Sequence, residues 1–99
     1  MRIAILTFDG FNELDSFIAL GLLSRLRADG WKAEIASPAS RVTSMNGVTV
    51  QGQRPLEYAN EADAVIFGSG IYTRAIADNS ALLDRLRLDP LRQTIGAIW

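Results

Sequence analysis

The chain has 99 residues, of which 48% are hydrophobic and 21% are charged, and its net charge at pH 7 is −1. Such a composition is typical of a single globular domain, and the charge gives no reason to expect nucleic acid or an anionic membrane as a partner. The sequence contains no cysteine and no histidine, which excludes disulfides and thiol nucleophiles within these residues and removes the commonest general base near neutral pH.

We expect neither a metal nor a cofactor, because thiolate and imidazole ligands are both missing. No apolar run approaches the roughly 20 residues that span a bilayer. The first residues also lack the long apolar stretch and the cleavage site of a signal peptide. A cytoplasmic protein without a membrane partner is therefore predicted.

The first third of the chain predicts a strand, a helix and a second strand. Residues 2–8 are predicted to form a strand buried on both faces, with the apolar run at residues 3–6. Apolar residues spaced by three and four predict an amphipathic helix from about Phe11 to about Ala28. Gly30 is expected to cap this helix in the left-handed conformation. Residues 31–37 should form a strand parallel to the first. The apolar stripe of the helix comprises Phe11, Leu14, Phe17, Ile18, Leu22 and Leu26.

A hairpin is predicted over residues 42–50, where Asn46-Gly47 favours a type I′ turn. The elements expected after it are a strand at 64–67, a helix at 71–78, a helix at 82–86 that Ser80 caps, and a strand at 94–99. This order predicts an α/β fold, with a mostly parallel sheet, helices covering it and a small hairpin. The last strand lacks a covering element, which indicates the first half of a larger fold or a cover from another chain. A complete small sheet is the alternative.

Three apolar strands, at residues 3–6, 64–67 and 94–99, should end side by side and form one crevice, where open α/β sheets bind ligands. Asp15 follows the first strand and shares a helix face with Ile18. Partial burial there would raise the pKa of its carboxyl and suit it to acid or base chemistry. Alternatively, Asp15 is a first-turn residue that the helix dipole favours.

Gly68-Ser69-Gly70 follows the second of these strands, and its backbone amides could hold an anion or a developing oxyanion. An ordinary turn is the alternative. The segment is no phosphate loop, because Gly-Lys-Ser/Thr does not follow it. Ser69 is not expected to be a nucleophile, because Phe67 replaces the first glycine of the Gly-x-Ser-x-Gly elbow and no histidine exists to activate a serine.

Taken together, these stretches resemble the ThiJ/PfpI family of the class I glutamine-amidotransferase-like superfamily. This family includes the parkinsonism-linked deglycase and the isonitrile hydratases. The resemblance runs through the whole chain in the right order, but it covers only the first half of a typical member. The stretches that carry it are residues 2–6, 9–15, 43–47, 64–70 and 95–98.

The resemblance implies that residues 1–99 are the N-terminal portion of a flavodoxin-like α/β domain, that the protein forms a homodimer and that its substrate is a small molecule. It implies that Asp15 is the acid facing a nucleophilic cysteine. It also implies that the amides of Gly68, Ser69 and Gly70 contribute to an oxyanion site. In the family the cysteine follows the last strand, and here Trp99 stands at or just before its position.

Two functions follow from this resemblance. The first is the N-terminal portion of a hydrolase, hydratase or glyoxalase/deglycase-type enzyme whose nucleophile is absent from the 99 residues, which should themselves be inactive. The alternative is a catalytically inactive ligand-sensing or self-associating module of the same fold.

Overall fold

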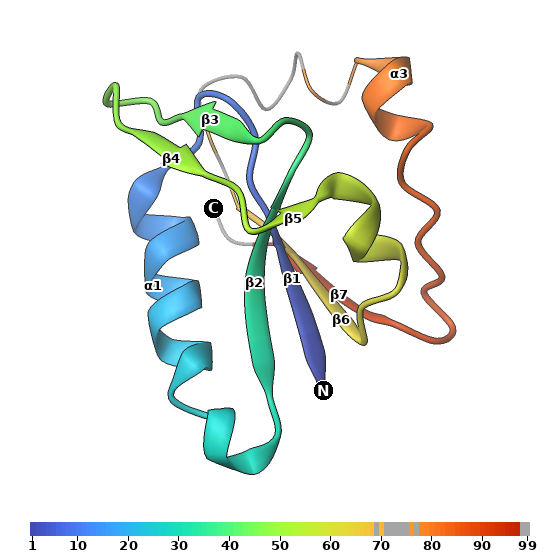
Figure 1. Cartoon of the computed structure of the whole chain (residues 1–99). Coiled ribbons are helices and arrows are strands. Elements are labelled where there is room, and N and C mark those ends of the chain that lie inside the picture. The colour runs from blue at the N-terminus through green and yellow to red at the C-terminus, as the bar shows by residue number, and fades with distance from the viewer. Residues whose placement is uncertain (69, 71–75, 77, 98–99) are drawn as a thin grey trace.

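The computed structural model of the chain describes residues 1–68, 70, 76 and 78–97 (Figure 1). Its centre is a five-stranded sheet with the order β5-β2-β1-β6-β7, in which every neighbouring pair is parallel. The strands of this sheet are β1 (Arg2–Leu6), β2 (Lys32–Ser37), β5 (Arg54–Pro55), β6 (Ala64–Phe67) and β7 (Thr94–Ala97).

Helices cover both faces of the sheet (Figure 1). One face packs against α1 (Glu13–Ser24), which is followed by the 3-10 helix η1 (Arg27–Asp29). The other face packs against the 3-10 helix η2 (Leu56–Asn60) and α3 (Ser80–Leu83). The four longer strands have the order β2-β1-β6-β7, which is the flavodoxin-like arrangement. The predicted fold class is confirmed.

Strand β1 separates two apolar layers. Its side chains alternate, so that Ile3 and Ile5 pack on the α1 side while Ala4 and Leu6 pack on the η2 side. All four are buried, as is typical of a parallel strand covered on both faces. This explains why the sequence of β1 is an uninterrupted apolar run.

Helix α1 is shorter than predicted and turns its other side to the sheet. It begins after Asn12, whose side-chain oxygen accepts a hydrogen bond of 3.0 Å from the Leu14 amide. The buried residues of the helix are Ser16 and Ala19, whose small side chains allow close packing on the sheet. The prediction that the large apolar stripe faces the core was wrong. The stripe residues that are exposed are Leu14, Phe17, Ile18 and Leu22.

The predicted hairpin is present as β3 (Arg41–Thr43) paired with β4 (Thr49–Gln51). The prediction that a type I′ turn connects the two strands was wrong. A type I′ turn needs a positive φ at both central residues. Among the described residues only glycines have positive φ, and Gly47 has φ 84°. The Gly47 amide donates to the Ser44 carbonyl at 3.1 Å. The connection is therefore a longer loop that ends in a left-handed glycine.

Two predictions about helix ends had different outcomes. The left-handed cap at Gly30 is confirmed, with φ 83°, although it closes η1 rather than α1. Ser80 is the first residue of α3 and not its cap. Asn79 caps that helix, because its side-chain oxygen accepts a hydrogen bond from the Leu82 amide at 3.2 Å.

Most of the helix predicted at 71–78 falls outside the described residues. None of the described helices has the length and apolar character needed to cross a bilayer.

Hydrogen bonds from side chains hold the irregular segment that follows α3 against η2. The Arg85 guanidinium donates two hydrogen bonds to the Glu57 carboxylate, at 2.7 and 2.9 Å, and a third to the Pro38 carbonyl at 2.9 Å. The buried Gln93 side chain donates to the carbonyls of Ala59 and Ala62, both at 2.7 Å. These side-chain hydrogen bonds hold the segment in place, as backbone hydrogen bonds between strands do in the sheet.

Replacing Glu57 with glutamine should lower the melting temperature at pH 7 and have a smaller effect at acidic pH. The hydrogen bonds from Arg85 lower the pKa of Glu57 from 4.5 to about 2. Because the pKa is depressed by folding, the stabilisation is present above pH 4.5 and is lost as the pH falls toward 2. Thermal melts of the wild type and Glu57→Gln between pH 7 and pH 3 measure the difference. Glu61→Gln serves as the control for an exposed carboxylate, and a Glu57→Gln effect independent of pH would contradict this account.

Candidate functional site

The carboxyl ends of three strands lie next to one another. Leu6 of β1 is paired with Phe67 of β6, and Phe67 is paired with Ala97 of β7. The predicted neighbour relation among the three strands is confirmed. The chain leaves β1 for β2 on one side and meets β6 on the other, so the β1–β6 boundary is a topological switch point. Open α/β sheets bind ligands at such a boundary.

The turn after β6 lies against the first turn of α1. A β-carbon built on Gly68 would lie 3.2 Å from the Ser16 hydroxyl oxygen and 3.9 Å from the Asp15 β-carbon. Asp15 itself is half-buried. The predicted proximity of Asp15 and the Gly68 turn is therefore confirmed, although the two residues are far apart in the sequence.

Gly70 brings the loop after β6 onto the loop after β1. It forms an isolated antiparallel bridge with Phe11. A β-carbon on Gly70 would lie 2.5 Å from the Gly10 carbonyl oxygen and 2.9 Å from the Phe11 α-carbon. Only glycine fits this contact between two backbones. Ser69 and Trp99, which the sequence analysis also assigned to the site, lie outside the described residues.

Two buried hydroxyls lie beneath the site, and the sequence analysis missed them. The Thr7 and Ser16 hydroxyl oxygens are 3.2 Å apart, and the Thr7 hydroxyl also lies 3.3 Å from the Ile5 carbonyl, to which it donates. Both residues are almost completely buried. Their pairing satisfies two polar groups inside the core and connects α1 to the end of β1. The sequence did contain a sign of this pair, because Thr7 and Ser16 are hydroxyl residues that stand beside apolar segments.

The hairpin holds the loop between β1 and α1 in place. The Gly10 amide donates to the Thr43 carbonyl at 2.7 Å, and the Thr43 amide donates to the Asp9 carboxylate at 3.0 Å. The Asn46 side-chain amide donates to the Glu13 carboxylate at 2.9 Å. A backbone hydrogen bond, together with those from side chains of the hairpin, holds the pKa of Glu13 below its usual value. The loop that meets Gly70 is thus connected to both α1 and the hairpin.

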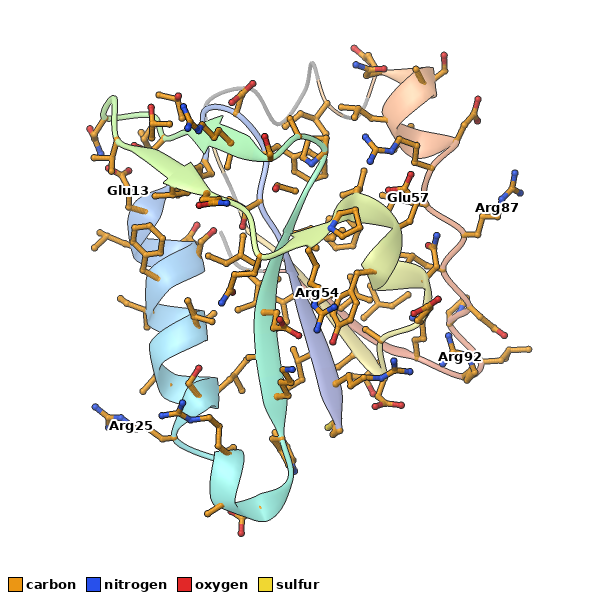
Figure 2. The ribbon with its side chains drawn as sticks, in the orientation of Figure 1. Glu13, Arg25, Arg54, Glu57, Arg87 and Arg92 are labelled. Carbon is orange, nitrogen blue, oxygen red and sulfur yellow. The ribbon has the colours of Figure 1, made fainter. Side chains whose placement is uncertain are left out.

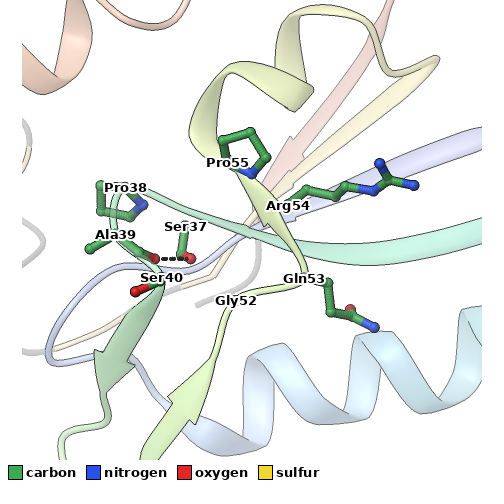
Figure 3. Close-up of a pocket in the computed structure, with 8 residues that line it drawn as sticks. All are labelled: Ser37, Pro38, Ala39, Ser40, Gly52, Gln53, Arg54 and Pro55. Atoms are coloured by element: carbon green, nitrogen blue, oxygen red, sulfur yellow. Dashed lines mark hydrogen bonds between the residues drawn. The ribbon is translucent and has the colours of Figure 1, made fainter.

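A cavity of about 300 Å³ lies elsewhere, at the carboxyl end of β2 (Figure 3). Its walls come from the segments on either side of the hairpin. The Ser37 hydroxyl is directed to the Ala39 carbonyl at 2.6 Å, and Arg54 is paired with Glu34 at 3.0 Å. Its main polar groups are therefore already bonded within the chain. The described residues contain no group of three or more acidic side chains that could hold a metal ion.

Taken together, the described site offers a half-buried carboxylate, close backbone packing at two glycines and a pair of buried hydroxyls. Among its described residues, Asp15 is suited to hold or transfer a proton, and amides of a glycine-containing turn are suited to stabilise negative charge. Neither role requires a metal. The described site supplies no strong nucleophile, because the chain contains no cysteine and no histidine to activate a hydroxyl.

Comparison with known proteins found no matching family model and no matching curated protein. Solved structures do match. A C103A mutant of the DJ-1 superfamily protein STM1931 from Salmonella typhimurium is 24% identical, with a TM-score of 0.75 over 97% of this chain and 54% of that chain. Oxidized DJ-1 from Toxoplasma gondii is 19% identical, with a TM-score of 0.71 over 97% of this chain and 54% of that chain.

An AraC family transcriptional regulator from Pseudomonas putida is 21% identical, with a TM-score of 0.65 over 99% of this chain and 55% of that chain. The chain therefore has the fold found in the DJ-1/ThiJ/PfpI superfamily, and it spans about half the length of these solved structures.

Gly70→Ala should destabilise the protein more than Gly68→Ala. A methyl group at Gly70 meets two backbone atoms that cannot move without shifting a loop, so we expect a loss of about 1–3 kcal/mol in the free energy of unfolding. At Gly68 the nearest atom is the Ser16 hydroxyl oxygen at 3.2 Å, a side-chain atom that has to move by only a few tenths of an ångström. Urea denaturation measures both losses. Gly96→Ala, in β7, is the control because nothing lies within 4 Å of the added carbon. An equal loss at Gly68 and Gly70 would contradict the packing described here.

Proposed function

We propose that the chain is the N-terminal part of a ThiJ/PfpI-like enzyme that acts on a small molecule as a hydrolase, hydratase or glyoxalase/deglycase. The observation that carries this proposal is the contact between the first turn of α1, which bears Asp15, and the turn at Gly68. The share of the solved structures that the chain covers supports the proposal of a part of a longer protein, because the chain spans about half the length of structures that have its fold.

In the proposed enzyme, Asp15 exchanges a proton with the nucleophile or with a substrate atom bound to it. The amides of Gly68, Ser69 and Gly70 stabilise the negative charge that develops on the substrate. The nucleophile is a cysteine that residues 1–99 do not contain, and Trp99 stands at or just before its position. The proposed enzyme is cytoplasmic and works without a cofactor.

A second candidate is a catalytically inactive module that senses a ligand or self-associates. Two observations favour it, namely the absence of any cysteine in the chain and the similarity of its fold to a protein described as a transcriptional regulator. Both candidates include self-association, with a homodimer as the proposed assembly. They differ in whether a thiol follows the last strand.

The purified 99-residue chain should not turn over methylglyoxal or an isonitrile, because it has no thiol to attack either compound. Absorbance assays at high protein concentration measure the rate. Turnover at a rate near that of full-length enzymes of this fold would contradict the proposed dependence on a cysteine.

Reading the gene beyond codon 99 should reveal Cys-x-Gly within the next few codons, followed by a helical pattern. In that longer protein, Asp15→Asn should lower kcat/KM by about 10²–10⁴-fold, the usual range for an acid or base. Glu13→Gln is the matched control on the same helical turn, since its carboxylate bonds to the hairpin. A stop codon directly after codon 99 would contradict the enzyme and favour the inactive module.

A further inference from the structure

The loop of the hairpin contains Asn46 followed directly by Gly47, and both residues are exposed. In any chain, the backbone nitrogen that follows an asparagine can attack the side-chain carbonyl carbon of that asparagine. Glycine hinders this attack least, because it has no β-carbon and the widest range of backbone angles. No atom lies within 4 Å of a β-carbon built on Gly47. No other part of the described chain therefore crowds the turn where the attack takes place.

The other three asparagines of the chain are held in ways that Asn46 is not. The side-chain oxygen of each accepts a hydrogen bond from a backbone amide, and a residue with a β-carbon follows each. The side-chain oxygen of Asn46 accepts no hydrogen bond from the described residues, and only its side-chain nitrogen is bonded. Asn46 is therefore the asparagine whose side chain is best placed to react. The other three are Asn12, Asn60 and Asn79.

The side-chain nitrogen of Asn46 connects the hairpin to the first turn of α1. It donates a hydrogen bond of 2.9 Å to the carboxylate of Glu13, which lies at the start of the helix beside the hairpin (Figure 2). An ionised carboxylate only accepts hydrogen bonds. The contact therefore depends on the N–H groups of the Asn46 amide.

We propose that Asn46 is a site of spontaneous deamidation and that its conversion releases the tip of the hairpin from the first turn of α1. In the first step the Gly47 nitrogen forms a bond to the side-chain carbonyl carbon of Asn46. The bond from that carbon to the side-chain nitrogen breaks, and ammonia leaves with the proton of the Gly47 amide. Water then opens the five-membered imide at either carbonyl, which gives aspartate or isoaspartate. Water is the co-reactant, and nothing is oxidised or reduced.

The product replaces a hydrogen-bond donor with a second carboxylate. Two ionised carboxylates have no proton to share, and their like charges repel each other at this distance. A backbone hydrogen bond and those from Asn46 and Ser44 hold the pKa of Glu13 below its usual value. Loss of the Asn46 donor and the added negative charge both raise that pKa. Because Glu13 and Asp15 share the first turn of α1, the modification acts beside the candidate site, although its chemistry does not depend on the proposed enzyme.

The folded loop slows the reaction without blocking it. The Gly47 amide donates to the Ser44 carbonyl at 3.1 Å, so this hydrogen bond has to open before the nitrogen can attack. The buried Ser44 hydroxyl accepts hydrogen bonds from the amides of Asn46 and Val48, at 3.3 and 2.9 Å. We therefore expect the folded chain to react more slowly than the unfolded chain. Ser44→Ala, which removes the two bonds to the hydroxyl, should react faster than the wild type.

Mass spectrometry of tryptic peptides, after incubation of the purified chain at mildly alkaline pH, tests the modification. The peptide of residues 42–54 should gain one mass unit at Asn46, as a mixture of aspartate and isoaspartate, before any other asparagine of the chain reacts. Gly47→Ala should slow the gain, and Ser44→Ala should accelerate it. An Asn46 that stays intact in the folded chain while the guanidinium-unfolded chain converts would overturn the proposal.

Substitutions test the release of the hairpin separately from the chemistry. At pH 7, Asn46→Asp should lower the melting temperature by a few degrees and raise the pKa of Glu13 in an NMR titration. Asn46→Ala, which removes the amide without adding a charge, is the matched control and should lose less. Combining Glu13→Gln with Asn46→Asp should restore the lost stability, because the glutamine amide can donate to the new carboxylate. An Asn46→Asp variant as stable as the wild type, or a double variant without recovery, would overturn the release. These readouts do not depend on activity, so they separate this inference from the proposed enzyme.

Discussion

Strand β1 is hydrogen-bonded along its length to a parallel neighbour on each side, and the rest of the structure depends on this pairing. It is matched with β2 on one side and with β6 on the other. A parallel neighbour requires the chain to return by a crossover. The crossover to β2 contains α1, whereas β6 is reached later through η2. The boundary between these two connections is where the loops after β1 and β6 meet, so the position of the candidate site follows from the central strand.

The strands were predictable because a parallel strand buried on both faces needs an unbroken apolar run, as residues 3–6 and 64–67 have. The orientation of α1 was not predictable from spacing alone. Its small buried residues, Ser16 and Ala19, allow the helix to pack closely, whereas a count of large apolar residues indicates the opposite face. The hairpin connection was missed for a similar reason, because Asn46-Gly47 fits both a two-residue turn and a longer loop ending in a left-handed glycine.

The candidate site was predictable as far as topology determines it. Parallel strands end at one edge of a sheet, and this places the helix after the first strand near the turn after Gly68. The roles of Asp15 and of the glycine turn stay predictions, since contact between residues does not establish chemistry. The Thr7–Ser16 pair was predictable only in part. A hydroxyl residue beside an apolar segment indicates a buried polar group, but the sequence does not show whether its partner is water or another side chain.

Gln93 illustrates how one side chain can substitute for a strand. Its amide nitrogen donates to two carbonyls of the segment that leads into β6, and its amide oxygen accepts a hydrogen bond from the Asp89 amide at 2.8 Å. Both donors and the acceptor are therefore in use inside the core. A glutamate of the same shape would direct an anion at two carbonyl dipoles, and a leucine would remove all three hydrogen bonds. Chemical identity, rather than size or hydrophobicity, is what this position selects.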